Sequence, residues 1–420
     1  MSADAFSASP PAQRITALLD TGSLARGQAQ AFGSLITGVG TIGGKEVTIV
    51  ATDRHVAGGS LGVAESQALA SLMDQSHVAK RPFLMCLDSA GARLDQGLPA
   101  LGAFRHLYRR MLDLRLAGLP LLALIGRDCF GGASMLAATC EKRVYSEISR
   151  LAMSGPAVIQ ALGGVTELDS ADSAAVVSLM GGRARKALSP TDILCTDTMD
   201  AYREAALDWI GAAQVAKPNL HQQHTRLGTR LLSQGIVPSA PRNIRDEMPG
   251  ILQEIIPAGI NVNTMDGVLV GRNGNTTLNA FFGFIDGKPV GALAAWTLAG
   301  ECLLHAAERP GEAVTIFLDS PGQAPTFSDE QVMLSEYVAH LALALSSLRH
   351  SGHRLTLQVL GDAAGGIYVA LAAPSVRVVA LPGANVQILP PAAVARVLNR
   401  HMATGDIDDY IRAGVIDTMI

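Results

Sequence analysis

The chain has 420 residues, of which 48% are hydrophobic, 17% charged and 4% aromatic, and its formal net charge is −4. Average soluble chains carry about 25% charged residues, so this composition indicates a large apolar core and excludes a disordered or coiled-coil protein. There is no basic tract, which argues against a nucleic-acid partner. Glycine is enriched at 43 residues, and this predicts many tight turns and close backbone approaches.

The N-terminal residues 1–13 are small and polar and contain prolines, and we expect a disordered tail there. They lack the basic and apolar regions of a secretory signal peptide, and no apolar run reaches the about 18–20 residues that span a bilayer. The five cysteines show no C-x-x-C spacing, and the histidines show no metal spacing. We therefore expect a cytoplasmic protein without disulfides, a bound metal or a membrane partner.

Residues 38–47 predict a glycine-rich β-hairpin. Gly38, Gly40 and Gly43 have the spacing of the G-x-G-x-x-G dinucleotide fingerprint. That fingerprint must open a helix, whereas this segment continues as a strand over 46–51. The hairpin is therefore the favoured interpretation.

The next motif, Gly58-Gly59-Ser60-Leu61-Gly62, has the G-x-S-x-G pattern of a nucleophile elbow and precedes a predicted helix over 64–73. In an elbow the serine lies at the tip of a strand, but a spacer over 53–57 separates Ser60 from the preceding strand. A serine hydrolase is thus one hypothesis for this motif. The other is a loop whose glycines let the backbone approach a ligand.

Leu87-Asp88-Ser89-Ala90-Gly91 predicts the end of a buried strand and a tight turn. A helix over 98–117 and a strand over 119–125 follow, and Gly131-Gly132 then opens an alanine-rich helix. The first N–H groups of a helix are unpaired, and glycines let a carbonyl oxygen come close to them. This is how an oxyanion hole is built, although close packing of helix and strand would need the same glycines.

Two arginines are candidates for binding an anionic group. Arg93 follows the Asp-Ser turn, and Arg185 lies in a polar stretch over 181–186. A phosphate or carboxylate site is one hypothesis for them. A solvated arginine, and a helix cap with a surface loop, are the alternatives.

The second half of the sequence repeats the landmarks of the first half in the same order. Residues 281–290 resemble the hairpin at 38–47, Asp319-Ser320-Pro321-Gly322 resembles the Asp-Ser turn, and Gly365-Gly366 resembles the glycine pair. The three pairs are separated by 243, 231 and 234 residues. A predicted helix over 329–351 and a strand over 355–360 lie between the second and third landmarks. We infer a duplicated α/β domain with mostly parallel strands.

The domain boundaries follow from this repeat. We expect an N-terminal domain over 14–214, a proline-containing linker over 215–261 and a C-terminal domain over 262–420. Short helices over 222–233 and 245–255 are expected in the linker.

These segments resemble the crotonase-like carboxyltransferases, and in particular the biotin-independent malonate decarboxylases. Residues 14–212 resemble the beta subunit through Gly58–Gly62, Gly91–Leu94, Cys129–Gly132, Ser154–Ile159 and Leu168–Asp172. Residues 262–400 resemble the gamma subunit through Gly365-Gly366, Arg377–Leu381 and Ala393–Val397. The resemblance implies two tandem crotonase-like α/β domains with ββα superhelical cores, as a beta and a gamma subunit fused in one chain.

The resemblance also implies a reaction. A malonyl group, carried as a thioester on an acyl carrier protein or coenzyme A, loses carbon dioxide and leaves an enolate. Backbone N–H groups would hold the enolate oxygen, and an apolar pocket would favour departure of the carboxylate. No covalently bound cofactor is implied, and no Met-Lys-Met biotin-attachment motif occurs. Other malonate decarboxylase subunits and a homo-oligomer are the implied protein partners.

The site residues that we expect fall into four groups. The oxyanion hole would use the N–H groups of Gly131 and Gly132, with Ala90 or Gly91. In the second half, Gly365, Gly366 and Gly322 would serve the leaving carboxylate or a carboxyl-transfer step. Ser89, Gln323 and Tyr368 are candidates for proton handling. The substrate-binding candidates are Gly58, Gly59, Ser60, Arg93 and Arg185.

The sequence departs from the resembled family at three places. Gly322-Gln323-Ala324-Pro325 has no counterpart of the tyrosine in the expected Ser-Gln-Ala-Tyr-Gly turn, Leu389-Pro390-Pro391 replaces Gly-Lys-Lys, and Ala184 replaces an expected histidine. These changes leave the acyl group and the activity of the second half open. Two alternatives to a decarboxylase therefore stay open, a biotin-dependent carboxyltransferase component and a non-catalytic subunit that docks a carrier protein.

Overall fold

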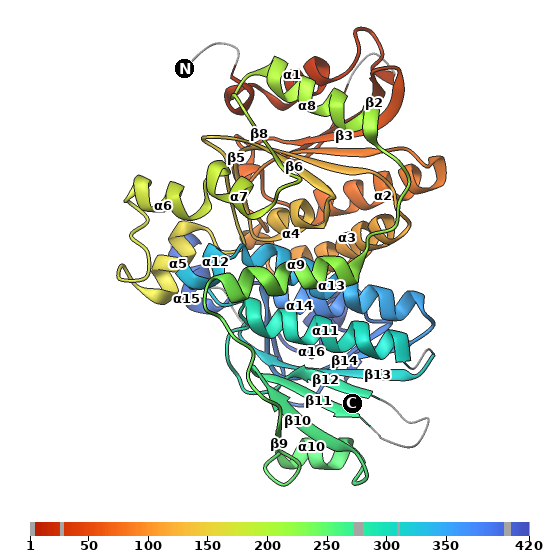
Figure 1. Ribbon diagram of the computed structural model, residues 1–420, viewed down its shortest axis with the longest axis vertical. Helices are drawn as coiled ribbons and strands as arrows, with labels where there is room; N and C mark the ends of the chain where they lie inside the picture. The colour runs from red at the N-terminus through yellow and green to blue at the C-terminus, as the bar shows by residue number, and fades with distance from the viewer. Residues whose placement is uncertain (1–4, 26–28, 273–279, 309–310, 399–404, 420) are drawn as a thin grey trace.

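Two β-sheets, one in each half of the chain, organise the molecule (Figure 1). The computed structural model describes residues 5–25, 29–272, 280–308, 311–398 and 405–419. Helices cover both faces of the first sheet and the face of the second sheet that is turned toward the first unit, and the two α/β units are stacked along the long axis of the molecule. The predicted fold class, two tandem α/β units with mostly parallel strands, is confirmed.

The first sheet begins with an antiparallel hairpin and continues as parallel strands. In spatial order its strands are β1 (Gln30–Phe32), β2 (Leu35–Ile42), β3 (Lys45–Thr52), β4 (Phe83–Ser89), β5 (Leu121–Phe130), β6 (Lys142–Ser146) and β8 (Ile193–Cys195), with β7 (Arg150–Ala152) also paired to β5. The β2–β3 hairpin confirms the interpretation of the glycines at 38–43. Because β4 and β5 are buried along most of their length, they carry the nearly continuous apolar runs expected of central parallel strands.

Helices cover the first sheet on both faces (Figure 1). One face carries α2 (Val63–Ala79), α3 (Leu98–Leu116) and α4 (Gly132–Thr139), which share a core with the second unit. The other face carries α1 (Pro11–Leu18) and α8 (Met199–Ala212), which close a separate core. Three further helices, α5 (Pro156–Gly163), α6 (Ser173–Met180) and α7 (Gly182–Leu188), lie at one side of this unit.

The prediction of a disordered tail is wrong for residues 5–13. They form a short 3-10 turn, η1 (Phe6–Ala8), and the start of α1. The Phe6 ring is fully buried and stacks on Tyr202 with ring centroids 3.8 Å apart. A single aromatic in a polar segment gave too weak a pattern to show this packing, and residues 1–4 lie outside the described part.

The second sheet has the same parallel centre. In spatial order its strands are β17 (Thr418–Met419), β15 (Arg377–Ala380), β14 (Arg354–Ala364), β13 (Ala313–Ser320), β12 (Ala280–Phe284), β11 (Val268–Arg272), β10 (Asn261–Met265) and β9 (Arg242–Asn243), with β16 (Asn385–Gln387) also paired to β14. Its helices are α11 (Ala292–Glu308), α12 (Phe327–Gln331), α13 (Leu334–His350), α14 (Gly365–Ala372), α15 (Pro391–Leu398) and α16 (Ile407–Arg412). The single helix predicted over 329–351 is divided, because Met333 adopts a φ of 65° between α12 and α13.

The proposed hairpin match at 281–290 is wrong. Residues 280–284 form β12, which is parallel to β13, and the segment beyond it leads to a bridge between Val290 and Gln323. In the first half, the corresponding bridge joins Leu61 to Ala92. The shared Ile-x-Gly-Lys-x-Val pattern therefore lies at unequal places in the two units, which explains its larger separation in the sequence.

The predicted linker contributes to the second unit. Its helix α9 (Leu220–Ser233) lies against α11 and α13, and α10 (Gly250–Ile255) is shorter than predicted. Strand β9 joins the second sheet, and Leu252 of α10 belongs to a core cluster of that unit. This stretch is therefore a folded part of the second unit along much of its length.

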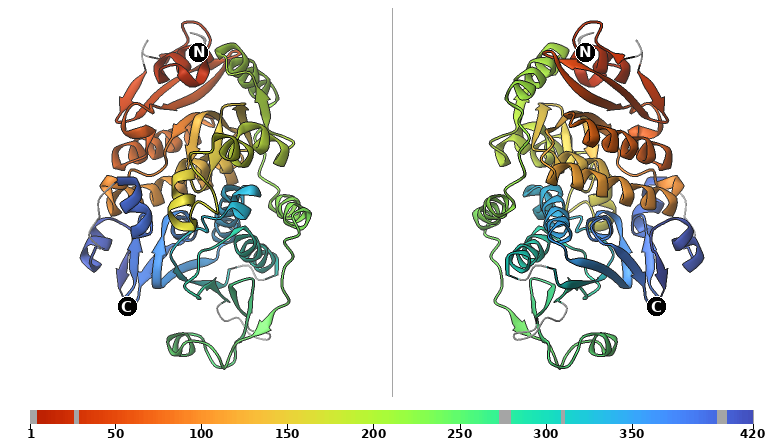
Figure 2. Two further views of the ribbon diagram at one scale, coloured as in Figure 1. Left: turned by 90° about the vertical axis from the view of Figure 1, so that its left-hand side faces the viewer. Right: turned by 90° about the vertical axis from the view of Figure 1, so that its right-hand side faces the viewer.

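The two units pack directly against each other, as both views of Figure 2 show. Helix α13 of the second unit contacts α3 and α4 of the first. The hydroxyl oxygens of Ser134 and Ser335 are 2.8 Å apart across this contact. The buried guanidinium of Arg143 donates to Glu336 over 2.8 Å. The two units thus share one continuous core.

Candidate functional site

A cavity of about 240 Å³ lies where the two units meet, and both glycine pairs line it. The first unit contributes the starts of α3 and α4 and residues 153–158, and the second contributes Gln323, the start of α14 and residues 388–389. Among the described residues that line this cavity, none has a charged side chain. The polar groups that remain are backbone amides, the Gln323 carboxamide and the Ser154 hydroxyl.

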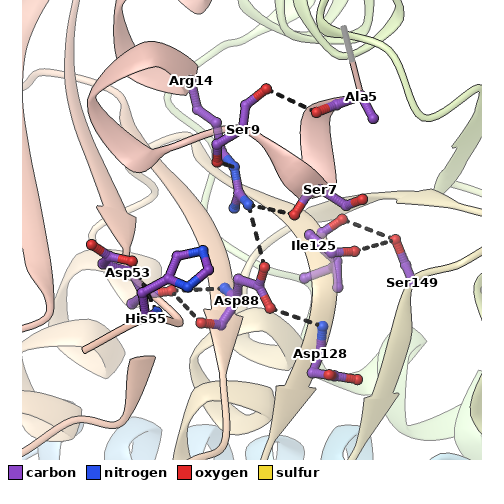
Figure 3. Close-up of polar contacts among 12 residues, drawn as sticks. Ala5, Ser7, Ser9, Arg14, Asp53, His55, Asp88, Ile125, Asp128 and Ser149 are labelled. Carbon is purple, nitrogen blue, oxygen red and sulfur yellow. Dashed lines mark hydrogen bonds and ion pairs between the residues drawn. The ribbon is translucent and has the colours of Figure 1, made fainter. Parts of the chain in front are cut away.

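The end of strand β4 is fixed from behind by a buried carboxylate (Figure 3). Asp88 Oδ2 lies 3.3 Å from Arg14 Nη2, and Asp88 Oδ1 accepts the Asp128 N–H over 3.2 Å. Burial raises the pKa of Asp88, and the Arg14 charge opposes that rise. Arg14 also donates to the carbonyl oxygens of Ser7 and Ser9. These bonds hold the turn that follows Asp88 in one position.

Three of the four expected oxyanion donors in the first half are already bonded within the chain. The Ala90 N–H donates to the Gly58 carbonyl over 2.9 Å, and the Gly91 N–H donates to Ser89 Oγ over 3.1 Å. The Gly131 N–H donates to the Ala152 carbonyl over 3.2 Å. Their expected role as donors is therefore contradicted. Ser89 is likewise taken up by this turn and does not line the cavity.

Two backbone N–H groups on the first-half wall have no partner in the described part of the chain. Gly132 is the first residue of α4, whose intrahelical hydrogen bonding begins with the Met135 N–H. Ala92 lies in a parallel bridge in which Leu61 bonds to Gly91 and Arg93, so the bridge does not use the Ala92 amide. Ala92 is not among the site residues predicted from the sequence. The alternation of amide directions along an extended segment is the signal that could have identified it.

The second half repeats the hydrogen bonds of the Asp-Ser turn and of its bridge, and we call this arrangement the frame. The Gly322 N–H donates to Ser320 Oγ over 3.2 Å, and Asp319 Oδ1 accepts the Asp362 N–H over 3.0 Å. Val290 donates to the Gly322 carbonyl and accepts from the Ala324 N–H, both over 2.9 Å. Each of these contacts has a counterpart in the first half, so the two turns are equivalent in structure.

The glycines at the turns are equivalent too. Gly91 and Gly322 have φ angles of 104° and 119°, and Gly131 and Gly365 have φ angles of 56° and 59°. Only glycine adopts these conformations readily. A Cβ at Gly91 would lie 3.0 Å from the Phe130 carbonyl oxygen, and one at Gly322 would lie 3.1 Å from that of Ala364. The close approach of turn and strand end therefore recurs in both units.

One side chain distinguishes the two frames. The bridge position occupied by Ala92 in the first half is occupied by Gln323 in the second. Gln323 Oε1 accepts the N–H of Gly366, the second residue of α14, over 3.1 Å. Gly366 corresponds to Gly132, so the amide that is open in the first half is bonded in the second.

The arginines expected to bind substrate are engaged elsewhere. Arg93 Nη2 lies 2.5 Å from a carboxylate oxygen of the fully buried Glu65 and 2.8 Å from the Ser60 carbonyl. Arg185 is fully buried and donates to the Leu151 and Glu330 carbonyls, each over 2.7 Å. Neither arginine lines the cavity between the units. Both expectations are therefore contradicted, because internal carboxylates and carbonyls already satisfy these side chains.

The glycine-serine loop and Tyr368 also have structural roles. A Cβ on Gly59 would overlap the Asp88 carbonyl oxygen, so the glycine permits contact with the end of β4 and not with a ligand. Gly58 and Ser60 do not line the cavity either. The Tyr368 hydroxyl is buried and donates to the Val415 carbonyl. Burial raises the pKa of that phenol, which makes it unsuited to proton transfer.

The serine-hydrolase hypothesis lacks its partners. Ser60 Oγ donates to the Ala57 carbonyl over 2.6 Å and accepts from Arg93 Nε over 3.2 Å. No histidine contacts it in the part of the chain that the structure describes. Within the same residues, no group of three or more His, Cys, Asp or Glu side chains is placed to hold a metal ion. No described helix is both long and apolar enough to cross a membrane.

Two residues at the contact between the two units, which we call the seam, were not predicted as site residues. Ser154 lines the cavity, and among described residues its buried hydroxyl has no hydrogen-bond partner. Its N–H donates over 2.6 Å to Glu330, a fully buried carboxylate of the second unit. Burial raises the pKa of Glu330 to about 7, although Arg185 opposes the rise. A lone serine and a lone glutamate far apart in the sequence carry no motif, so only the packing of the units identifies them.

The comparisons with known proteins agree with one another on the family. A family model described as the carboxyl transferase domain matches residues 11–406. The methylmalonyl-CoA carboxyltransferase 12S subunit of Propionibacterium freudenreichii subsp. shermanii is 25% identical in an alignment of 406 residues that covers 91% of this chain and 73% of that protein. A malonyl-S-ACP:biotin-protein carboxyltransferase of Malonomonas rubra is 28% identical in an alignment of 187 residues that covers 40% of this chain and 58% of that protein.

A solved structure is similar to part of this chain. A Pseudomonas malonate decarboxylase hetero-tetramer in complex with malonate contains a chain that is 26% identical over 54% of this chain and 90% of its own length. The TM-score of that match is 0.49.

Proposed function

The chain belongs to the carboxyl transferase family, and from that premise we propose that it removes carbon dioxide from a malonyl-type thioester. The observation that carries the proposal is the cavity between the units. It is apolar, it is lined by both glycine pairs, and two unpaired amides of the first half lie on its wall. The thioester would be supplied by coenzyme A or by an acyl carrier protein.

The first half would stabilise the enolate. When the carboxylate carbon leaves the malonyl group, the electron pair of the broken C–C bond moves to the thioester carbonyl oxygen. The amides of Ala92 and Gly132 supply two uncharged donors to that oxygen. One such donor contributes about 10²–10³-fold to the rate in enzymes where it has been removed.

The lining of the cavity would favour release of carbon dioxide. A carboxylate enters a site that holds no counter-ion among the described lining residues, so the charged substrate is poorly solvated there. The charge is spread onto the thioester oxygen as the C–C bond breaks, where the amides receive it. Because the contribution of ground-state desolvation to rate enhancement is contested, we attribute most of the rate enhancement to the Ala92 and Gly132 amides.

A proton must then return to the α-carbon to give the acetyl-type thioester. Ser154 supplies a hydroxyl on the cavity wall, and Glu330 lies behind it on the Ser154 amide. With a pKa of about 7, Glu330 can hold a proton at neutral pH. The Ser154 hydroxyl would donate its proton to the α-carbon and take a replacement from solvent, and Glu330 would position Ser154 through its backbone amide.

The same proposal covers the partners. A thioester carrier as substrate, with no cofactor covalently bound to this chain, fits the thioesters named in the two relatives. Each half would correspond to one subunit of a decarboxylase. The 12S subunit, which is named a carboxyltransferase and not a decarboxylase, also aligns with 91% of the chain. A homo-oligomer and association with further subunits are parts of the proposal that mass analysis of the assembly can test.

The direct test is incubation with malonyl-CoA, and separately with malonyl-acyl carrier protein, followed by mass measurement of the thioester. Conversion of malonyl to acetyl thioester is expected with one of the two. If a folded sample converts neither, the proposed function is wrong.

A second candidate is carboxyl transfer to biotin on a separate carrier protein, since one relative is named for that acceptor. Adding a biotinylated carrier protein separates the two. A decarboxylase turns over without it, whereas a transferase requires it. Docking of a carrier without catalysis would show binding and no turnover under either condition.

A further inference from the structure

The second glycine pair of the cavity is closed by a side chain of its own unit. Gly366 N–H is the structural counterpart of the open Gly132 N–H, and it donates to Gln323 Oε1 over 3.1 Å. Gln323 occupies the bridge position that Ala92 occupies in the first half. The alanine side chain is too short to reach the neighbouring helix start, whereas the glutamine carboxamide reaches it.

The position of Gln323 also depends on Gly365. A Cβ at Gly365 would lie 2.6 Å from Gln323 Oε1, so only glycine leaves room for the carboxamide there. Gly365 has a φ of 59°, which further restricts the position to glycine. The glycine pair of the second half is therefore shaped around an internal carbonyl group, whereas in the first half the small Ala92 occupies the corresponding bridge position.

The orientation of the carboxamide follows from its bond. The Gly366 amide is a donor, so the oxygen of the carboxamide must face it and the Nε2 group must face away. Among the described residues Nε2 has no hydrogen-bond partner, and Gln323 lines the cavity. The second half thus offers the cavity an uncharged NH₂ donor in place of the backbone amide that it covers.

From this geometry we propose that Gln323 makes the second half a site that holds a carboxylate and excludes a carbonyl-bearing carboxyl acceptor. A ureido or amide carbonyl that bound at Gly366 N–H would need the position that Gln323 Oε1 occupies. The Nε2 group instead donates to the carboxylate of the malonyl group. An uncharged donor orients that carboxylate without a counter-ion that would oppose loss of carbon dioxide. The inference rests on the proposed function for the identity of the substrate.

The test for the closed acceptor site needs no turnover. Biotin methyl ester serves as the probe, because it carries a ureido carbonyl and no charge, and its binding is measured by equilibrium dialysis. The unaltered protein and Gln323→Leu, which keeps the position filled, are expected to bind it weakly and alike. Gln323→Ala removes the internal acceptor and is expected to bind it about five- to tenfold more tightly, the value of one net hydrogen bond.

Each outcome decides the matter. Equal binding by the unaltered protein and Gln323→Ala overturns the proposal, and so does tighter binding by Gln323→Leu. Gain of binding by Gln323→Ala alone supports it, even if no malonyl thioester is decarboxylated, in which case the proposed function fails and the closed acceptor site stands.

The carboxylate role has its own readout. In Gln323→Glu the side chain can still accept from Gly366, but it presents an oxygen to the substrate in place of the NH₂ group. A rise of KM for malonyl-CoA of about tenfold or more, larger than the fall of kcat, is expected. A fall of kcat with KM unchanged would contradict the assignment.

Discussion

The two halves of the chain carry the same turn-and-glycine frame and differ in what fills it. In the first half, Ala92 leaves the amide at the start of α4 open to the cavity. In the second, Gln323 bonds the amide at the start of α14. A duplicated frame can therefore keep its backbone geometry while one side chain changes the chemistry that it offers.

The largest expected effect comes from removing the open amide itself. Proline is tolerated at the first position of a helix and has no N–H, so Gly132→Pro deletes the donor while α4 is retained. A Cβ there would lie 2.7 Å from the Phe104 ring, so Phe104→Leu is included to make room. The matched control is Gly132→Ala with Phe104→Leu. The proline variant should lose about 10²–10³-fold in kcat relative to this control.

Equal rates for the proline and alanine variants would remove Gly132 from the mechanism. A circular dichroism spectrum and a melting curve of each variant separate a lost donor from a lost fold.

A second experiment gives the first half the side chain of the second. Ala92→Gln should let a carboxamide oxygen bond the Gly132 amide, as Gln323 does at Gly366. Turnover of malonyl-CoA is then expected to fall by about 10²-fold, the lower value for one occupied donor. Ala92→Ser, which stays small, serves as the control and should keep most of the activity. If the glutamine variant remains as active as the serine variant, the open amide is not what distinguishes the halves.

The positions of the turns and glycine pairs could be predicted from the sequence, but the hydrogen-bond partners of their amides could not. The glycine pairs and Asp-Ser turns are local patterns that the sequence shows, whereas the meeting of Gly132 and Gly366 in one cavity is seen only in the structure. The donors at Ala90, Gly91 and Gly131 were wrong because their partners are Gly58, Ser89 and Ala152. Those bonds depend on which strands become neighbours, and residue type alone does not reveal that.

Arg93 and Arg185 also have partners that the sequence does not reveal. A conspicuous arginine beside a glycine motif suggests an anion site, but the carboxylates of Glu65 and Glu330 come from other elements and pair with them inside the fold. The residue that most distinguishes the halves, Gln323, is predicted from the sequence only as a candidate for proton handling. Its bond to Gly366 becomes visible only in three dimensions.

A third prediction concerns the seam between the halves. Glu330 is fully buried between Ser154 and Arg185, and its pKa is raised from 4.5 to about 7. An acid with a raised folded-state pKa stabilises the fold below its unfolded pKa, and this contribution is lost as the pH rises from about 4.5 to 7. Glu330→Gln keeps the neutral form at every pH. The Tm of this variant minus that of the unaltered protein should therefore increase between pH 5 and pH 8.

A pH-independent difference in Tm would show that Glu330 does not titrate in this range. A Tm difference that decreases as the pH rises would show that the pKa of Glu330 is lowered by folding and not raised.

The smallest effect is expected at the loop that the sequence suggested as a nucleophile elbow. Ser60→Ala removes the hydrogen bonds of Oγ with Ala57 and Arg93 and should cost about 1 kcal/mol of stability, measured by urea unfolding. Turnover of malonyl-CoA should be unchanged, since Ser60 does not line the cavity. Complete loss of activity in a stably folded Ser60→Ala protein would restore the hydrolase hypothesis.

The central claim is that the first half releases carbon dioxide through an enolate held by its open amides. Incubation with malonyl-CoA in D₂O tests it directly, because an enolate that is protonated from solvent gives an acetyl group with one deuterium. The account predicts singly deuterated acetyl-CoA from the unaltered protein and about 10²-fold less from Ala92→Gln. Unconverted malonyl-CoA and malonyl-acyl carrier protein with a folded sample, or deuterated product formed equally well by Ala92→Gln, would contradict it.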